Sequence, residues 1–312
     1  MAKPCSRLFP RVWDWVRAIR RIYRAYYAAH GFYPSLISPV RYTEKVQWRK
    51  LFDLNPLYIV LCDKLAVRDF ISERVGSEFL VPLLWTGNNP EAIPFDALIP
   101  PYIVKSTHST AHTIIVEDRA TQNEEAMRKT ARAWLEACHG TRSDEIGYVN
   151  VPHRLVAEEL LLQKDGSPPI ERKFFVFHGI AKIVKSVTRS GKDRTPMFSF
   201  HTLDWTRLPW KETDPVPGLV NPPRHLREMV RIAERLAAGL EHVRVDMYEC
   251  DDEIYVGEMT LYSQSGFFPF QPDSADYLLG SYWNLPSNRK RAVWTMLTKR
   301  REICRGSLQP TS

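Results

Sequence analysis

The sequence predicts an α+β protein with two or three lobes, and three observations support this class. The chain has 312 residues, of which 44% are hydrophobic and 25% are charged, as in a globular protein with a large core. Several stretches repeat their apolar residues at helical spacing. Other short stretches read as strands and come in pairs separated by short polar turns, which predicts antiparallel sheets.

The overall composition argues against several classes of protein. We find no run of about 18 apolar residues that would predict a transmembrane helix, and no apolar segment typical of a secretory signal. The cysteines are scattered and form no CxxC pair, which favours reduced thiols in a cytosol over a disulfide framework or a zinc site. We therefore expect a cytoplasmic protein. The cysteines are Cys5, Cys62, Cys138, Cys250 and Cys304.

The positive charge is concentrated at the two ends of the chain. The net charge is +7, and residues 1–30 and 287–312 each carry +6. The stretch between them therefore has a net charge of −5. Because a nucleic-acid-binding domain normally carries a basic patch over its body, we expect no nucleic-acid partner.

Residues 11–30 predict a helix with one aromatic and apolar face and several arginines on the other positions. Two interpretations remain open. The apolar face packs on the body of the protein, or the helix makes a peripheral contact with an anionic membrane, at its inner face. A linker with Pro34 and Pro39 follows.

The spacing of apolar residues and the positions of proline and polar residues predict the next elements. Residues 82–101 read as loop-rich, and residues 188–222 as a polar, proline-rich loop. We predict helices over 43–52, 62–71, 122–139 and 224–240, and strands over 102–105, 113–117, 154–162, 173–177 and 180–187.

Two of these strands carry charged residues that suggest a site. The strand 102–105 ends in Lys105, and a turn rich in small hydroxyl residues follows it. Hydroxyls, backbone N–H groups and a lysine can fold over a triphosphate, although an ordinary hairpin with a surface lysine has the same pattern. Glu158 and Glu159 interrupt the apolar strand 154–162. Buried carboxylates need partners, so at least one of them is expected to face a cleft.

The stretch 243–260 predicts a hairpin with an acidic turn. With Asp251 to Glu253 as a three-residue loop, Asp246 lies opposite Glu258 and Arg244 lies opposite Thr260. Two hard-oxygen carboxylates beside an arginine could seat Mg²⁺ with phosphates. A two-residue turn would instead place the two acids on opposite faces, and an edge hairpin with solvated acids is the alternative. The face expected to be buried carries Val243, Val245, Met247, Tyr255, Met259 and Leu261.

The order of these features resembles the ATP-grasp superfamily, and specifically its TupA-like branch, named for teichuronopeptide biosynthesis. The resemblance covers roughly residues 40–280. It is carried by Lys105 with its small-residue loop, Ala157-Glu158-Glu159, Arg244-Val245-Asp246, Gly257-Glu258-Met259-Thr260 and Gly266, together with Glu44-Lys45-Val46-Gln47-Trp48, Asn55-Pro56-Leu57-Tyr58, Asp63-Lys64-Leu65-Ala66-Val67-Arg68 and Lys173-Phe174-Phe175-Val176-Phe177-His178-Gly179.

The resemblance implies ATP and Mg²⁺ between two α+β lobes with antiparallel sheets, preceded by a short helical region. The resemblance implies a helical region (41–100) and two lobes (101–150 and 151–285), and the charge pattern adds a basic helix and linker (1–40) and a basic tail (286–312). The implied residue roles are nucleotide binding by Lys105, Ser109, Thr110, Ala111, Glu158, Glu159, Leu161 and Lys173, metal binding by Asp246, Glu258 and Thr260, and catalysis by Arg244 and Lys105.

The implied activity is a carboxylate–amine ligase that works through an acyl phosphate. Its partners would be a small-molecule or glycan carboxylate, such as a uronic acid of a cell-surface polysaccharide, and an amine. Three residues depart from the family pattern: Ser109 and Ala111 replace glycines in the phosphate loop, and Thr260 replaces an asparagine. A glycan or metabolite kinase of the same fold, or a catalytically degenerate nucleotide-binding protein, is therefore the alternative.

Overall fold

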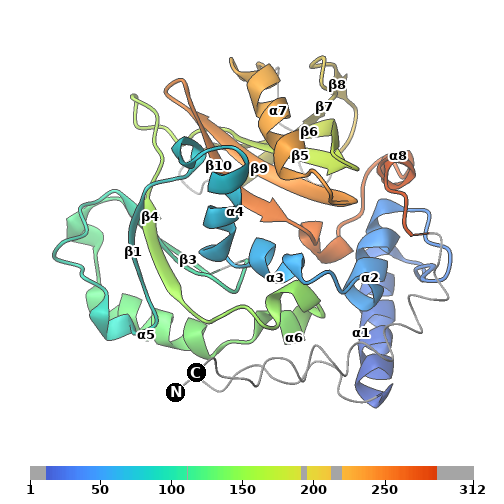
Figure 1. The fold of residues 1–312 in the computed structure, drawn as a ribbon, viewed down its shortest axis with the longest axis horizontal. Helices are drawn as coiled ribbons and strands as arrows, with labels where there is room; N and C mark the ends of the chain where they lie inside the picture. Colours follow the sequence, from blue (N-terminus) through green and yellow to red (C-terminus); the bar gives the residue numbers. More distant parts are fainter. Residues whose placement is uncertain (1–11, 111, 191–194, 212–219, 287–312) are drawn as a thin grey trace.

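The computed structural model describes residues 12–110, 112–190, 195–211 and 220–286, which form two antiparallel sheets and the helices around them (Figure 1). The helices are α1 (Val12–His30), α2 (Tyr42–Phe52), α3 (Leu57–Cys62), α4 (Ala66–Arg74), α5 (Glu124–Glu136), α6 (His139–Ser143), α7 (Leu226–Leu236) and α8 (Ser274–Tyr282).

The first sheet has four strands in the order β1-β4-β2-β3, and the second has six in the order β10-β9-β5-β6-β7-β8. All neighbouring strands are antiparallel, which confirms the predicted α+β class. The strands are β1 (Leu83–Gly87), β2 (Tyr102–Ser106), β3 (Thr113–Val116), β4 (Leu155–Glu159), β5 (Glu171–Phe177), β6 (Ile180–Ser190), β7 (Thr195–His201), β8 (Arg207–Leu208), β9 (His242–Cys250) and β10 (Glu253–Thr260).

Each sheet has its own hydrophobic core. Helix α5 covers the first sheet and buries Met127 and Ala131 in the smaller core. Helix α7 packs against β5, β6 and β9, and its apolar stripe enters the larger core. That stripe consists of Met229, Ile232, Ala233 and Leu236, which recur at the spacing of one helix face.

Helix α2 is buried almost along its whole length although its sequence is polar. Its long side chains donate to carbonyl oxygens of segments near the other end of the chain, as buried polar groups generally require. The Nζ atom of Lys45 donates to the carbonyls of Gly280 and Trp283 (2.8 and 2.7 Å), Arg49 Nη1 to those of His242 and Leu261 (2.9 and 3.1 Å), and Lys50 Nζ to that of Ser265 (2.6 Å).

The corner between α3 and α4 connects the two sheets. The backbone N–H of Lys64 donates to the Thr107 carbonyl (3.2 Å) beside the first sheet. A little further along, Leu80 forms a bridge with Val256 of the second sheet. The predicted lobe 101–150 contains β2 and β3, whereas β1 and β4 lie before and after it in the sequence and belong to the same four-stranded sheet. The division of the chain into regions and lobes stays a prediction.

Two loop predictions are wrong. Residues 82–101 contain β1, and residues 188–222 contain the end of β6 as well as β7 and β8. Pro196 is tolerated in β7 because β8 is short and pairs only with Phe200 and His201. At Pro196 the strand therefore has β6 as its ladder partner on one side only, which leaves room for a residue without an N–H donor.

Two further expectations concern thiols and membranes. Cys62 and Cys250 are free, whereas Cys138 is disulfide-bonded, so the expectation of reduced thiols is wrong at Cys138.

In the part of the chain that the structure describes, no helix combines the length and the apolar composition needed to cross a bilayer. The apolar stripe of α1 is also accounted for, because Ala18 and Ile22 are buried in a cluster with Leu51 of α2.

Candidate functional site

The β9–β10 hairpin places Asp246 directly opposite Glu258 and Arg244 opposite Thr260, as predicted. The predicted loop is nevertheless wrong, because Cys250 pairs with Glu253 and only Asp251 and Asp252 form the turn. The register shifts between Val256 and Glu258, where Gly257 is an extra residue in β10. This bulge compensates for the shorter turn and returns both carboxylates to one face.

The same bulge changes which residues of β10 are buried. Ile254 and Val256 are buried, whereas Tyr255 is only half-buried, so the prediction for Tyr255 is wrong. The other residues predicted for the core face are buried: Val243, Val245, Met247, Met259 and Leu261.

Asp246 is fully buried and accepts hydrogen bonds from two cations. Arg244 Nε and Nη2 donate to its two carboxylate oxygens, each at 2.7 Å, and Lys173 Nζ donates at 2.7 Å from the neighbouring strand. Burial acts to raise the pKa of Asp246, but the charges of Arg244 and Lys173 outweigh it and hold the pKa below its ordinary value. Asp246 is therefore ionised and fixes both cations on this face.

Two hydroxyls complete the surroundings of Arg244. Its Nη1 donates to Ser263 Oγ at 2.6 Å, and its Nη2 donates to Thr260 Oγ1 at 3.0 Å. Thr260, predicted as a metal ligand, thus contacts Arg244 in this structure. Glu258 is half-buried, and no hydrogen bond or ion pair from the described residues reaches its carboxylate.

A row of charged residues crosses the second sheet from strand to strand. Glu258 lies opposite Asp246, Asp246 lies opposite Lys173, and Lys173 lies opposite Lys185 of β6. Lys173 also donates to Glu171 Oε1 at 2.8 Å. Lys185 is buried, and its Nζ lies 3.9 Å from the centre of the Phe198 ring. Two carboxylates at one end of the row are therefore followed by two lysines.

The first sheet carries a second charged cluster around Glu158. Lys105 Nζ donates to Glu158 Oε2 at 2.7 Å, and Arg68 Nη1 donates to Glu158 Oε1 at 3.0 Å. Glu158 therefore has the partners that a nearly buried carboxylate needs. Glu159 is exposed and Leu161 is half-buried beyond the end of β4, and neither side chain joins this cluster among the described contacts.

Lys64, in the turn between α3 and α4, binds the loop that follows β2. The Nζ atom of Lys64 donates to the carbonyl of Ser109, which is buried, whereas Thr110 is exposed. Asp63, next to Lys64, accepts from Arg154 Nη2 at 2.7 Å. The third residue predicted for this loop, Ala111, lies outside the described residues.

Lys64 is subject to the charges of both clusters. Burial lowers the pKa of Lys64. The charge of Lys105 in the first sheet also lowers it, whereas the charges of Glu258 in the second sheet and Glu158 in the first raise it. The sequence-based site did not include Lys64 or Arg68. The available signal was their spacing in the predicted helix 62–71, in which residues four apart share a face. In the structure that helix begins only at Ala66, so Lys64 lies in the turn before α4 and Arg68 lies in its first turn.

Two carboxylates at this site could contribute to a divalent cation: Glu258, which is half-buried, and Asp246, whose oxygens accept from Arg244 and Lys173 in this structure. In the described ranges, no cluster of three or more His, Cys, Asp or Glu side chains is placed to hold a metal ion. Mg²⁺ needs fewer protein ligands, because one or two carboxylates suffice when substrate phosphates and water complete its shell. The opposed Asp246 and Glu258 therefore fit Mg²⁺ bound together with a phosphate.

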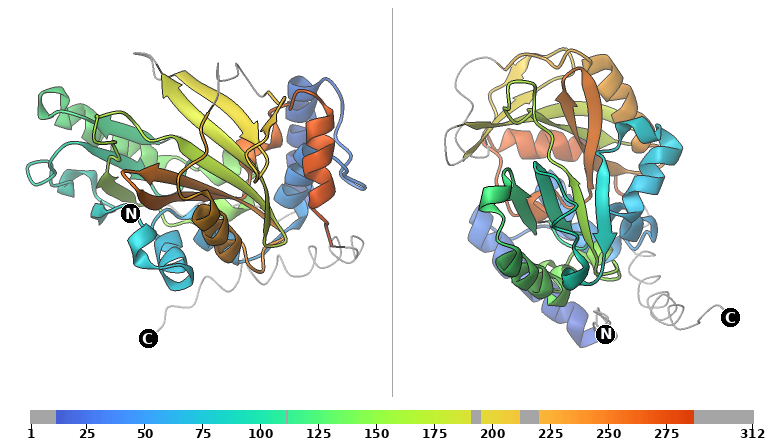
Figure 2. Two further views of the ribbon diagram at one scale, coloured as in Figure 1. Left: turned by 90° about the horizontal axis from the view of Figure 1, so that it is seen from above. Right: turned by 90° about the vertical axis from the view of Figure 1, so that its left-hand side faces the viewer.

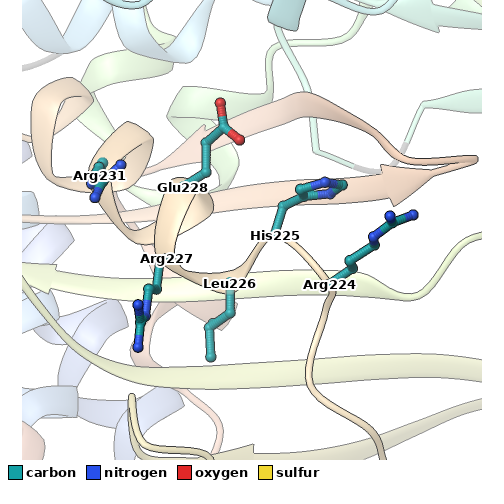
Figure 3. A pocket seen from close by; sticks show the side chains of 6 residues that line it. All are labelled: Arg224, His225, Leu226, Arg227, Glu228 and Arg231. Atoms are coloured by element: carbon teal, nitrogen blue, oxygen red, sulfur yellow. The ribbon is translucent and has the colours of Figure 1, made fainter.

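A basic hollow of about 530 Å³ lies elsewhere, at the start of α7 (Figure 3). The backbone N–H groups of Arg224 and His225 already donate to Glu249 (2.9 and 2.8 Å), and Arg224 pairs with Asp252 (2.6 Å). Figure 3 shows Arg227 and Glu228 pointing to different sides of the helix. The hollow therefore presents no set of side chains that converge on a ligand.

The chain is similar to one known family and to several solved structures. A model of the TupA-like ATP-grasp family matches residues 44–284. No curated protein matches the chain. Among solved structures, D-alanine–D-alanine ligase from Bacillus anthracis is 18% identical, with 78% of this chain and 70% of that chain covered and a TM-score of 0.43. The ATP-grasp ligase PsnB, complexed with a minimal precursor, is 14% identical, with a TM-score of 0.40. The match covers 66% of this chain and 53% of the PsnB chain.

Proposed function

Because the chain belongs to the TupA-like ATP-grasp family, we propose that it is an ATP- and Mg²⁺-dependent ligase that joins a carboxylate to an amine. The observation that carries the proposal is the pair of charged clusters on two sheets, with Lys64 bonded to the loop that follows Lys105. One cluster offers carboxylates with Arg244 and Lys173, and the other offers Lys105 beside a loop of small residues. Together they supply the cations that a triphosphate and its transfer require.

In this proposal the nucleotide lies between the sheets. Lys105 leaves Glu158 to contact a phosphate, and Ser109, Thr110 and Ala111 lie over the triphosphate. Glu158, Glu159 and Leu161 line the nucleotide site at the end of β4, and Lys173 binds a phosphate from the second sheet. Asp246 and Glu258, with Thr260, hold Mg²⁺, which neutralises phosphate charge when bound.

The chemistry would proceed in two steps. An oxygen of the substrate carboxylate attacks the γ-phosphorus of ATP, the bond to the β-phosphate oxygen breaks, and ADP leaves with that electron pair. Arg244 stabilises the charge on the transferred phosphoryl group. The amine nitrogen then attacks the acyl carbon, inorganic phosphate leaves, and the nitrogen loses a proton to give the amide.

We infer the substrates from the name of the branch. The branch name supports a uronic-acid-type glycan carboxylate or a small acid of cell-surface polysaccharide synthesis, with an amino acid or similar amine. Such a role would place the protein in the cytoplasm, at the inner face of the membrane. A catalytically degenerate nucleotide-binding protein is the second candidate, favoured by the buried Ser109 whose carbonyl is already bonded to Lys64.

The first test is a thermal shift with Mg·ATP on the wild type and on Lys105→Ala, Glu258→Gln and Lys164→Ala. A ligand at about 100 times its Kd stabilises the folded protein by about 2.7 kcal/mol, so the unfolding temperature of the wild type should show a clear Mg²⁺-dependent rise. Lys105→Ala and Glu258→Gln should lose the rise, whereas Lys164→Ala, an exposed lysine elsewhere, should keep it. A folded wild-type protein without any rise would contradict the proposal.

Product analysis then separates the activities. With acid, amine and ATP present, a ligase yields an amide, ADP and phosphate. A phosphorylated product that forms equally well without amine would identify a kinase instead. ATP binding without turnover of any acid and amine would support the degenerate protein.

A further inference from the structure

Helices α1, α2 and α8 lie together at one end of the molecule (Figure 2). Several exposed apolar side chains belong to this end. Of the large apolar side chains that are exposed among the described residues, most lie on residues 27–40 and on α8. Ile37 is 86% exposed and Tyr33 is 63% exposed, so neither has a place in the core. The full set, which we name the linker–α8 face, is Tyr27, Tyr33, Ile37, Val40, Tyr277 and Leu278.

Ring and backbone contacts join the parts of this face. The rings of Tyr27 and Tyr33 lie 4.7 Å apart. The guanidinium of Arg41 lies 4.2 Å from the Tyr277 ring centre and 4.5 Å from that of Phe32. The linker also lies against the backbone of α8, since a Cβ atom added at Gly280 would be 2.1 Å from the Val40 carbonyl oxygen. The linker, the end of α1 and α8 therefore form a connected surface.

The charges beside this face are predominantly positive. Arg20 and Arg24 are exposed on α1 and, with Tyr27, follow one another along one side of the helix. The acids nearby are already engaged. Asp273 pairs with Arg41, and the buried Asp276 accepts from the Thr43 hydroxyl at 2.6 Å. An approaching surface would therefore meet arginines and tyrosines with few opposing negative charges.

We propose that the linker–α8 face rests on an anionic membrane surface. Tyrosines with an apolar ring and a polar tip are favoured at the membrane–water interface, and arginines beside them attract anionic headgroups. Ile37 and Val40 would enter the boundary between headgroups and acyl chains. The apolar stripe of α1 takes no part, because Ala18, Ile22 and Tyr26 are buried in the protein.

The test is flotation of the full chain with phosphatidylcholine vesicles, with and without phosphatidylglycerol, for wild type, Ile37→Asp and Ile99→Asp. Ile99 is 78% exposed at a different place in the fold, which makes it a matched control. The wild type should bind the anionic vesicles more strongly than the neutral ones, and less at high salt. Ile37→Asp should weaken this binding by about tenfold or more, and Ile99→Asp should leave it nearly unchanged.

Three outcomes would overturn the proposal: equal binding by Ile37→Asp and wild type, equal binding to neutral and anionic vesicles, or no binding at all. A wild-type dimer that Ile37→Asp converts to a monomer, without a change in vesicle binding, would assign the face to a second copy of the chain. The Mg·ATP thermal shift of Ile37→Asp should match that of wild type, so failure of this proposal is independent of the nucleotide site.

Discussion

Asp246 lies directly opposite Glu258 although only two residues separate their strands at the turn. Asp251 and Asp252 both have positive φ (49° and 75°), as a tight hairpin turn of this kind requires. Without compensation, this turn would place the two carboxylates on opposite faces of the sheet. Gly257 adds the one residue that restores them to the same face.

Substitution of Gly257 by alanine should destabilise the protein. A Cβ atom there would lie 2.6 Å from Cε2 of Tyr248, and such overpacking costs about 1–3 kcal/mol. Urea unfolding would measure the loss. In the background of Tyr248→Leu, which removes the ring, the same substitution should cost much less. Additive effects of the two substitutions would contradict the assigned contact.

Substitution of Lys64 by methionine should weaken ATP binding. The change keeps an unbranched side chain but removes the charged donor to the Ser109 carbonyl. Hydrogen bonds from charged groups contribute about 1.5–3 kcal/mol, so Kd should rise by roughly tenfold or more. Isothermal titration with Mg·ATP measures it, and Lys164→Met is the matched control at an exposed lysine. Equal Kd values for the two variants would exclude Lys64 from the site.

The Arg68–Glu158 pair should be energetically coupled. Their side chains are only 15% and 10% exposed, so removing one leaves the other poorly solvated. A double-mutant cycle with Arg68→Met and Glu158→Gln, followed by urea unfolding, should give a coupling of about 1–3 kcal/mol. The corresponding cycle at the exposed Arg132–Glu91 pair should show little coupling. Similar values for both pairs would mean that burial does not strengthen the Glu158 cluster.

Stability should fall as the pH drops from about 6.5 to 4. Burial lowers the pKa of His108 and of His201 from 6.5 to about 4, so in this window the unfolded chain binds protons that the folded chain does not. Each group therefore adds stability above pH 6.5 that is lost on acidification, by up to about 1.4 kcal/mol per pH unit.

His201→Phe would test this dependence. The His201 ring stacks on Trp205 at 4.4 Å, and its Nδ1 has no hydrogen-bond partner among the described residues, so phenylalanine can occupy the place. Urea unfolding followed at pH 7.5, 5.5 and 4.5 should show a shallower loss of stability in the variant. The same slope as wild type would show that His201 is not one of the titrating groups.

The family and the α+β ATP-grasp fold could be predicted from the sequence, because they depend on local periodicity and on motifs in a fixed order. The opposition of Asp246 and Glu258 was also predicted, but from the wrong turn. The prediction held only because the bulge at Gly257 offset the error. A bulge depends on contacts across strands, such as that between Gly257 and Tyr248, and leaves little trace in a single sequence.

The contacts of Lys64 and Arg68 could not be predicted in the same way. Arg68 donates a hydrogen bond to Glu158, which is 90 residues away in the sequence, and Asp63 accepts one from Arg154, which is 91 residues away. Helical spacing shows that two side chains share a face, but only the packing of α3 and α4 against the first sheet shows what that face contacts.

The buried polar helix α2 has a consequence for the order of events during synthesis. Lys45, Arg49 and Lys50 are made early, whereas the carbonyls that they contact belong to residues 242–283. Until those residues leave the ribosome, these cations lack the carbonyls that they contact in the folded protein, and α2 can pack only on α1. Contacts between such distant segments slow folding and prolong the exposure of apolar surface. Completion of the second sheet, rather than formation of the first helices, should therefore set the moment at which the nascent chain becomes resistant to proteases.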